Sequence, residues 1–252
     1  MKDVRIRDLG VALLDMVMPR LCVVCRQELQ LRERHICTCC LADLPQTWFW
    51  IMPRNPMADK FNACIQRDLQ EAPGDMRHEP YSYAAALFYY NSESGFRRIP
   101  QHLKYRSGIA SGRRFSARLG RHLAASPLFA DVDLVLPVPL HWTRLYRRGY
   151  NQAAVIAKVL AEALGVECRT DLLRRHRRTR TQTRMGMEAK SANVKGAFSL
   201  RRGAFPRPPR HVLLVDDTFT TGATLNACRK ALREALPEQV RISVATLAYV
   251  SS

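Results

Sequence analysis

Four segments of the chain have the apolar pattern of β-strands. Residues 212–215 (VLLV) are an unbroken apolar run, residues 133–138 read DLVLPV, and residues 81–90 are rich in aromatic and aliphatic side chains. Continuous apolar runs are typical of strands that a parallel sheet buries on both faces. Residues 240–250 alternate instead between apolar and other side chains. These four segments are the predicted main strands, and residues 194–200 suggest a further short one.

Helical periodicity fills the segments between these strands. Residues 109–125, 150–164 and 223–236 have apolar positions at helical spacing, and residues 96–105 resemble a short helix with a basic face. Strands that alternate with helices favour an α/β fold. We predict a doubly wound, mostly parallel sheet over residues 81–252.

The first third of the chain has a different organisation. Residues 1–18 have an amphipathic helical pattern, two cysteine pairs follow, and residues 45–80 are rich in Pro, Asn, Asp and isolated aromatic residues without a sustained period. We therefore predict a small N-terminal region over residues 1–80, with a helix, a cysteine knuckle and a linker.

The segment 212–224, VLLVDDTFTTGAT, carries the most specific chemistry. Asp216 and Asp217 follow the apolar run, where we expect the strand to end. The free N–H groups at the start of the next helix can hold a phosphate, and paired carboxylates suit the hydroxyl groups of a ribose. The segment thus predicts a 5-phosphoribose clamp; the alternative is a capped strand-to-helix junction without a ligand. The turn supplies hydroxyl groups and a flexible glycine from Thr218, Thr220, Thr221, Gly222 and Thr224.

A second turn between strand and helix is strongly basic. Within residues 140–152, Arg144, Arg147 and Arg148 precede Gly149. A basic turn that contains glycine is a second candidate anion site. Because such turns meet at the carboxyl ends of parallel strands, we expect it to face the same ligand as the aspartate turn.

Four cysteines have the spacing of a metal site. Cys22 with Cys25, and Cys37 with Cys40, form two C-x-x-C pairs separated by eleven residues. Four thiolates so spaced suit a tetrahedral, structural Zn²⁺ ion, which leaves no open position for a substrate. The alternative is disulfide pairing, which we disfavour because residues 1–18 lack the features of a secretory signal. Cys39 is adjacent to Cys40, so the sequence leaves open which of these sulfurs is the fourth ligand.

The charge of the chain favours polyanionic partners. Forty Lys and Arg against 22 Asp and Glu give a net charge of +18, and residues 174–184 hold six arginines in eleven positions. Such charge suits nucleic acid, although solubility alone is the other interpretation. No apolar run approaches the roughly 18 residues of a membrane helix, so we expect a cytoplasmic protein without membrane insertion.

Residues 212–224 resemble the 5-phosphoribosyl diphosphate (PRPP) motif of type I phosphoribosyltransferases. The resemblance implies that Asp216 and Asp217 orient the ribose, and that Mg²⁺ enters with PRPP. If the protein is an enzyme, Arg148 or a lid arginine would stabilise the departing diphosphate. The residues implied to bind PRPP are the two aspartates with Thr218, Thr220, Thr221, Gly222 and Thr224, and the implied lid residues are Arg180, Gln182 and Arg184.

Further motifs resemble the ComF family, which includes the GntX-type proteins. The family has a type I phosphoribosyltransferase fold and is associated with uptake and use of external DNA. This chain departs from it in having only Cys64 where members often carry further knuckle cysteines, and Lys190 where Arg is common. The motifs are the two cysteine pairs, LKY at 103–105, PVPL at 137–140, RRGYNQA at 147–153, TQT at 181–183, NVKGAF at 193–198 and the aspartate segment.

Two classes of function stay open at this point. One is a phosphoribosyltransferase-like protein that binds PRPP or ribose 5-phosphate, whether for DNA utilisation or for nucleobase salvage. The other is a non-catalytic uptake factor that binds single-stranded DNA beside a helicase. Exposed aromatic residues among the arginines would favour the second class, and Tyr105 and Tyr146 are the candidates.

Overall fold

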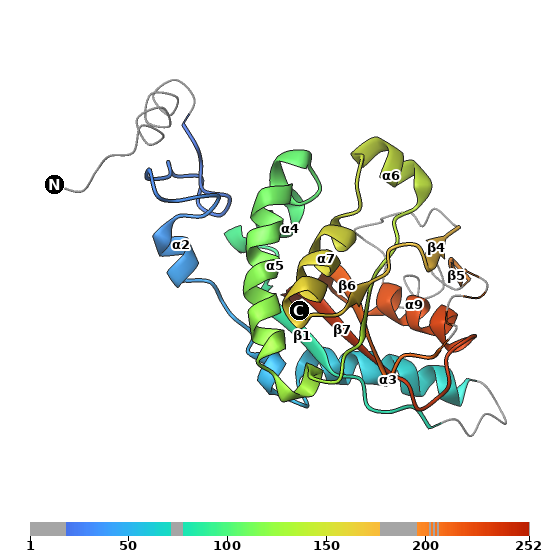
Figure 1. The fold of residues 1–252 in the computed structure, drawn as a ribbon. Helices are drawn as coiled ribbons and strands as arrows, with labels where there is room; N and C mark the ends of the chain where they lie inside the picture. The colour runs from blue at the N-terminus through green and yellow to red at the C-terminus, as the bar shows by residue number, and fades with distance from the viewer. Residues whose placement is uncertain are drawn as a thin grey trace.

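The computed structural model describes residues 19–71, 78–176, 196–201, 203, 205 and 207–251. At its centre is a five-stranded sheet in the order β1-β7-β6-β2-β3, in which every neighbouring pair is parallel (Figure 1). This confirms the predicted α/β fold with a mostly parallel sheet. The strands are β1 (Ala84–Tyr90), β2 (Leu134–Pro137), β3 (Glu167–Cys168), β6 (His211–Phe219) and β7 (Arg241–Val250).

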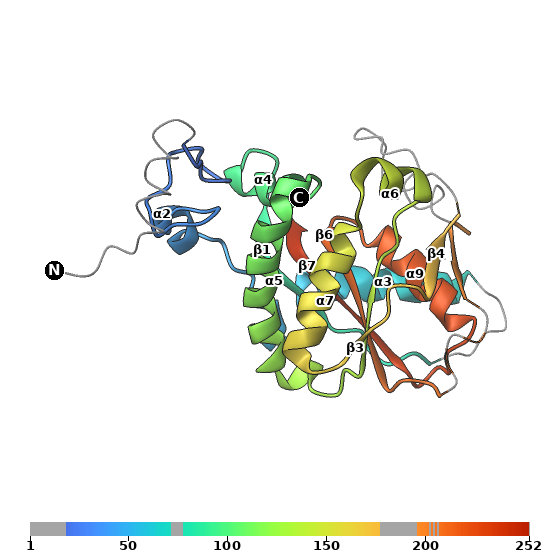
Figure 2. The same ribbon diagram turned by 45° about the horizontal axis from the view of Figure 1, so that its top comes forward.

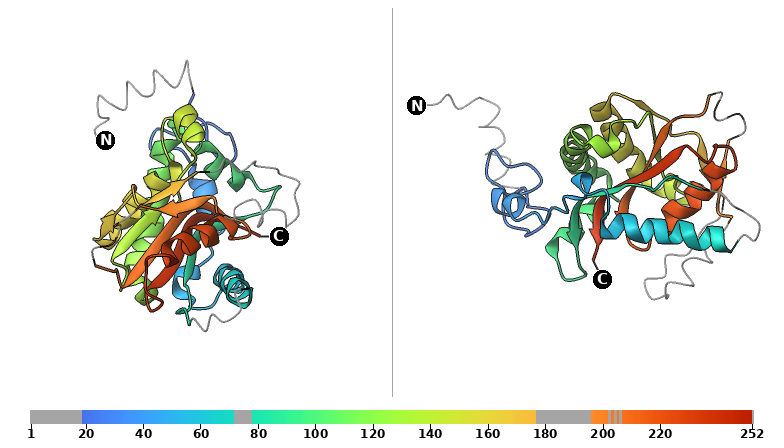
Figure 3. Two further views of the ribbon diagram at one scale, coloured as in Figure 1. Left: turned by 90° about the vertical axis from the view of Figure 1, so that its right-hand side faces the viewer. Right: turned by 90° about the horizontal axis from the view of Figure 1, so that it is seen from below.

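Helices cover both faces of the sheet. On one face, α5 (Ile109–Ala124) and α7 (Gln152–Leu164) lie side by side, as Figure 2 shows. On the other face, α3 (Pro56–Gln70) lies beside α9 (Ala223–Arg233), and Figure 3 shows the sheet between the two layers. Each helical layer packs against one face of the sheet and forms an apolar cluster with it, so the central strands are buried on both faces.

Helix α3 corrects the prediction of a linker over residues 45–80. Asn55 caps it by accepting hydrogen bonds from the N–H groups of Met57 and Ala58, at 3.1 and 2.9 Å, and Pro56 occupies its first turn. Met57, Ala58, Phe61 and Ile65 then bury one stripe of the helix against the sheet. The prediction of a linker is wrong for residues 56–70, while the domain boundary near residue 80 stays a prediction.

Strand β6 continues beyond the position where the sequence predicts its end. Asp216, Thr218 and Phe219 still pair with β7, which reaches Val250 and so supplies partners for them. The ring of Phe219 is buried in the core. The two aspartates therefore lie within the last residues of a central strand rather than in the turn after it.

The remaining elements are short. The basic turn over residues 140–152, which we predicted as a loop before the next helix, contains helix α6, because His141 caps a turn at its N-terminus. No helix in the described part of the chain is long and apolar enough to cross a membrane. The short elements of the fold are α2 (Thr38–Ala42), α4 (Arg98–His102), α6 (Trp142–Arg148), the 3-10 turns η1 (Phe49–Ile51), η2 (Gly95–Arg97), η3 (Arg106–Gly108) and η4 (Pro127–Phe129), and an antiparallel pair of β4 (Leu173–Arg175) with β5 (Phe198–Leu200).

A buried hydrogen-bond chain joins strands at the amino end of the sheet. His211 contacts Asp131 through Nδ1 at 2.6 Å and Ser243 through Nε2 at 2.7 Å, and the N–H of Tyr83 donates to the same serine oxygen at 3.0 Å. Burial lowers the pKa of His211 despite the opposing effect of Asp131. Ser243 is fully buried, so a substrate cannot reach this Asp-His-Ser arrangement, and its role is structural.

Candidate functional site

The two aspartates lie at the carboxyl end of β6, next to the N-terminus of α7. The Asp217 side chain accepts a hydrogen bond from Nε2 of Gln152 at 3.4 Å, and Nη1 of Arg148 donates to Oε1 of the same glutamine. Asn151 fixes this helix start, because its side chain donates to the Val138 carbonyl at the end of β2, at 3.0 Å. The fold thus brings Arg148 and Asp217 together through the amide of Gln152, so the two predicted turns lie beside each other.

Burial disfavours the charged form of both aspartates, and repulsion by Asp217 adds to this effect at Asp216. Asp217 is only 9% exposed, and Asp216 is half-buried. Burial raises the pKa of Asp216 well above its usual range, and the neighbouring Asp217 charge raises it further. Burial also raises the pKa of Asp217, against the opposing charges of Lys104 and Arg148. A hydroxyl donor or a cation placed at these carboxyl groups would favour their charged form and so counter the rise in pKa.

The sequence did not indicate three residues of this site as partners of the two aspartates. Lys104 and Gln152 act on Asp217, and the charge of Arg175 in β4 counters the high pKa of Asp216. The hydroxyl of Tyr150 donates to the carbonyls of Leu103 and Tyr105, which fixes the backbone on both sides of Lys104. The signal in the sequence was the motif context of Lys104 and Gln152, but motifs alone did not indicate that their side chains meet the acids.

The turn after β6 contains a glycine in the left-handed conformation and leads directly into α9. Gly222 has a φ of 76° and precedes α9, and a Cβ atom there would lie 2.9 Å from Cζ of Phe219. Both its conformation and this close approach therefore require glycine. The hydroxyl of Thr221 accepts from the N–H of Ala223 at 3.4 Å. Thr220 is exposed at the tip, while Thr218 and Thr224 are half-buried on either side of the turn.

The structure describes only some of the basic residues that the sequence indicated. Arg148 and Arg147 lie in the last turn of α6, which ends at Gly149 with a φ of 78°. A Cβ at Gly149 would lie 2.6 Å from a guanidinium nitrogen of Arg106, so this glycine allows a further arginine to approach. The predicted lid residues Arg180, Gln182 and Arg184, and also Lys190, lie outside the described residues.

Four cysteine sulfurs converge in the N-terminal knuckle. The Sγ atoms of Cys22, Cys25, Cys37 and Cys40 all lie within 4.8 Å of one another, and those of Cys25 and Cys37 are 3.8 Å apart. A tetrahedron with zinc–sulfur bonds of about 2.3 Å has edges of about 3.8 Å, so the donor set can hold a zinc ion. Cys39 is exposed and outside the cluster.

Hydrogen bonds prepare one of these sulfurs as a thiolate. Burial opposes ionisation of Cys22, but hydrogen bonds from the backbone N–H groups of Cys25 and Cys37 lower its pKa to about 7. Burial and the neighbouring sulfurs raise the pKa of Cys40. The charge of Cys22 is one cause of the raised pKa of Cys40. A divalent cation among the four sulfurs would offset this charge and favour the thiolate form of each cysteine, as in other metal sites.

Comparison with known proteins agrees with this geometry. Residues 148–251 match the Phosphoribosyl transferase domain family. The chain is 31% identical over 221 residues to "DNA utilization protein YhgH" of Salmonella typhimurium, which covers 83% of the chain and 89% of that protein. It is 37% identical over 110 residues to "Competence protein F" of Haemophilus influenzae, a match to 48% of that protein, and 33% identical over 104 residues to "Competence protein ComFC" of Streptococcus pneumoniae, a match to 43%.

The sheet, the aspartates at the end of β6 and the family match define a phosphoribosyltransferase-like protein. The similarity to YhgH extends over most of both chains. The chain belongs to the ComF family, whose members are named for competence and DNA utilisation.

Proposed function

We propose that this protein binds a 5-phosphoribosyl ligand, PRPP or ribose 5-phosphate, at the aspartate turn and uses it in DNA uptake and utilisation. The observation that carries the proposal is the convergence of Asp216, Asp217, Arg148 and the Gly222 turn at one end of the sheet. The names of its relatives supply the link to DNA.

Each part of the ligand has a matching group in this site. The 2- and 3-hydroxyls of the ribose donate to the carboxylates of Asp216 and Asp217, which have oxygen atoms left to accept them beside the hydrogen bonds from the Asp217 N–H and Gln152. The 5-phosphate occupies the turn from Thr220 to Thr224, at the positive end of α9. Arg148 and Lys104 lie on the Asp217 side, where they neutralise the charge of a diphosphate.

Catalytic turnover would require little covalent chemistry from the protein. The site offers orientation of the ribose and electrostatic stabilisation of a leaving diphosphate, both of which lower the barrier of a displacement at the ribose. Mg²⁺ bound with PRPP would supply further charge neutralisation to the diphosphate. Turnover, with a nucleobase as acceptor, is a step beyond binding and is measured separately as diphosphate release.

The Asp217→Asn variant is expected to bind PRPP about thirtyfold more weakly, because a charge-assisted hydrogen bond to a hydroxyl contributes about 2 kcal/mol. Its melting temperature should be equal or higher, since the substitution removes the charge that raises the pKa of Asp216. Calorimetry with PRPP and Mg²⁺ measures the affinity, and Asp43→Asn, an exposed residue that ends α2, is the control. Equal affinity of Asp217→Asn and wild type would remove the acids from the ligand site.

A second candidate function, binding of single-stranded DNA, is favoured by the surface of α6. Trp142 and Tyr146 are 69% and 89% exposed, and Leu145 lies between them on the same helical face, next to Arg144 and Arg147. Exposed aromatic rings with arginine neighbours suit bases that stack while the phosphates meet positive charge. Tyr105 is also exposed, as this hypothesis requires.

Joint substitution of Trp142 and Tyr146 by Ala should weaken binding of an oligothymidine strand by at least about thirtyfold, because each base stack contributes about 1–3 kcal/mol. It should leave the salt dependence unchanged, since no charge is removed. Joint substitution of Arg144 and Arg147 by Gln should instead flatten the slope of log affinity against log salt by about 1.4. Fluorescence anisotropy measures both, and wild-type affinity of the aromatic variant would place the strand elsewhere.

A further inference from the structure

Helix α3 lies against the turn of residues 220–224 (the phosphate turn), where the 5-phosphate is proposed to bind. It lies outside residues 148–251, which match the phosphoribosyltransferase family. Cδ2 of its fully buried Phe61 lies 3.6 Å from the position of a Cβ at Gly222. One turn later, the Cys64 thiol donates to the carbonyl of Thr221, with 3.7 Å between Sγ and the oxygen. Two side chains of α3 thus contact consecutive residues of the turn.

The contact with Cys64 controls the direction of one backbone N–H group. The carbonyl of Thr221 and the N–H of Gly222 belong to the same planar trans peptide, so they point in opposite directions. Because the carbonyl points toward α3, the Gly222 N–H points away from it, toward the side where the 5-phosphate is proposed to bind. Glycine neighbours make peptide rotation easy, so a fixed orientation here needs a partner.

The thiol is a suitable partner because it keeps its proton. Burial raises the pKa of Cys64, so its S–H group remains available as a donor at neutral pH. A thiol is a weak donor, and its effect is therefore orientation of the peptide rather than a large gain in stability.

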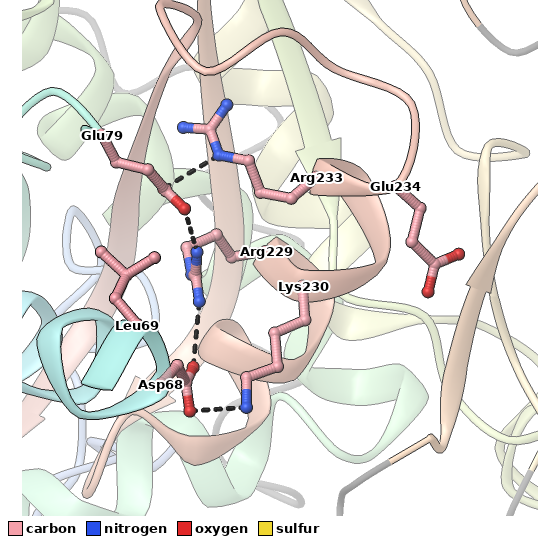
Figure 4. Close-up of a pocket in the computed structure, with 7 residues that line it drawn as sticks. All are labelled: Asp68, Leu69, Glu79, Arg229, Lys230, Arg233 and Glu234. Atoms are coloured by element: carbon pink, nitrogen blue, oxygen red, sulfur yellow. Dashed lines mark hydrogen bonds and ion pairs between the residues drawn. The ribbon is translucent and has the colours of Figure 1, made fainter. Parts of the chain in front are cut away.

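The same face of α3 also holds the helix that follows the turn. Four residues beyond Cys64, Asp68 accepts hydrogen bonds from Nδ2 of Asn226 at 2.7 Å and from Nη2 of Arg229 at 2.9 Å, and it pairs with Lys230. Figure 4 shows Asp68 below Arg229 and beside the nitrogen of Lys230. The first two turns of α9 are therefore fixed relative to α3, together with the turn that precedes them.

We propose that α3 is a positioning element of the phosphate site, and that Cys64 is the positioning residue that directs the Gly222 N–H toward the phosphate. The inference rests on the proposed function for the identity of the ligand, but the orientation of the peptide exists without a ligand. It gives residues 56–70 a direct role at a site whose proposed ligand-binding residues all lie later in the chain.

The sequence allows this peptide to be observed alone. Thr221–Gly222 is the single Thr-Gly dipeptide in the chain. Protein labelled with carbonyl-¹³C threonine and ¹⁵N glycine therefore gives one cross-peak in a carbonyl-to-amide correlation spectrum. The full-length chain is compared with Cys64→Ala and with Cys64→Ser, which keeps a donor. The control is Cys168→Ala, another partly buried cysteine, which lies in β3 at the far edge of the sheet.

Cys64→Ala should move or broaden this cross-peak, because the peptide loses the partner of its carbonyl, and Cys64→Ser should return it toward the wild-type position. Cys168→Ala should leave it in place. Calorimetry should show an affinity for ribose 5-phosphate about fivefold weaker in Cys64→Ala than in wild type, the equivalent of one neutral hydrogen bond. A wild-type cross-peak in Cys64→Ala, or identical spectra of the Ala and Ser variants, would overturn the inference.

Addition of ribose 5-phosphate to the labelled wild-type protein separates this inference from the proposed function. A shift of the same cross-peak on titration supports phosphate binding at Gly222. A cross-peak that responds to Cys64→Ala but not to the ligand would reject the proposed ligand site while it supports the orientation of the peptide by Cys64.

Discussion

Replacement of Cys37 by Ser is expected to release zinc from the purified protein and to unfold the knuckle around it. The sulfurs of Cys22, Cys25, Cys37 and Cys40 form a closed set within 4.8 Å, so three of them with a hydroxyl no longer make a tetrahedral thiolate site. Binding of structural zinc contributes on the order of 10 kcal/mol to the folding of small metal-dependent modules. The effect should therefore exceed that of any single hydrogen bond in this region.

The loss should extend to the body of the protein. Val23, Val24 and Ile36 of the knuckle belong to the same apolar cluster as the buried side chains of α5 and α7, and Arg98 of α4 donates to the Val24 carbonyl. Metal content by mass spectrometry and limited proteolysis of residues 19–44 measure the two effects. Cys39→Ser is the matched control, because that thiol is exposed and outside the cluster. A full zinc complement in Cys37→Ser would reject this set of ligands.

The cluster of four cysteines was predictable from sequence because its geometry is local. A C-x-x-C turn brings two sulfurs together whatever the rest of the chain does, so only the meeting of two such turns needed the fold. The aspartate turn was predictable for the same reason, since strand, acids and glycine are consecutive in residues 212–224. The position of the two aspartates within the strand was not predictable, because the pairing of β6 with β7 decides where the strand ends.

The partners of the acids depend on distant segments and could not be predicted. Lys104, Gln152 and Arg175 reach Asp216 and Asp217 from three different parts of the chain. Each is an ordinary polar residue in its own segment. Only the complete fold brings them together, because Lys104 follows α4, Gln152 begins α7 and Arg175 lies in β4 of the separate two-stranded sheet.

Helix α3 was missed because its apolar stripe is narrow and its other faces are polar. Met57, Ala58, Phe61 and Ile65 have helical spacing, but the surrounding residues of the segment suggested a linker. The cap by Asn55 with Pro56 was the local signal that could have found it. The partners of its Asp68 lie about 160 residues further along the chain, and no local pattern indicates them.

Substitution of Glu79 by Gln is expected to lower the free energy of unfolding by about 3 kcal/mol, the largest effect we expect from a single residue outside the knuckle. The Glu79 carboxylate is 4% exposed and pairs with Arg229 and with Nε of Arg233, the latter at 2.9 Å (Figure 4). The amide that replaces it leaves two buried guanidinium groups short of a counter-charge. Burial already lowers the pKa of Arg233, a sign that the environment disfavours its charge.

The matched control is Glu234→Gln. Glu234 lines the same cavity of about 410 Å³, but it is exposed, and Figure 4 shows its carboxylate directed away from the arginines. Urea unfolding followed by circular dichroism should therefore give a near wild-type midpoint for this variant and a clearly lower one for Glu79→Gln. A loss below about 0.5 kcal/mol in Glu79→Gln would show that water compensates the arginines and that the pair is not effectively buried.

A double-mutant cycle then asks whether the two acids act together. Asp68 and Glu79 share Arg229, so the first substitution leaves that guanidinium with one carboxylate and the second leaves it with none. Because the second loss is the costlier one, Asp68→Asn and Glu79→Gln combined should destabilise the protein by at least about 1 kcal/mol more than the sum of the single variants. Additive effects would mean that Arg229 relaxes toward solvent as soon as one partner is lost, and that the two acids stabilise the protein independently.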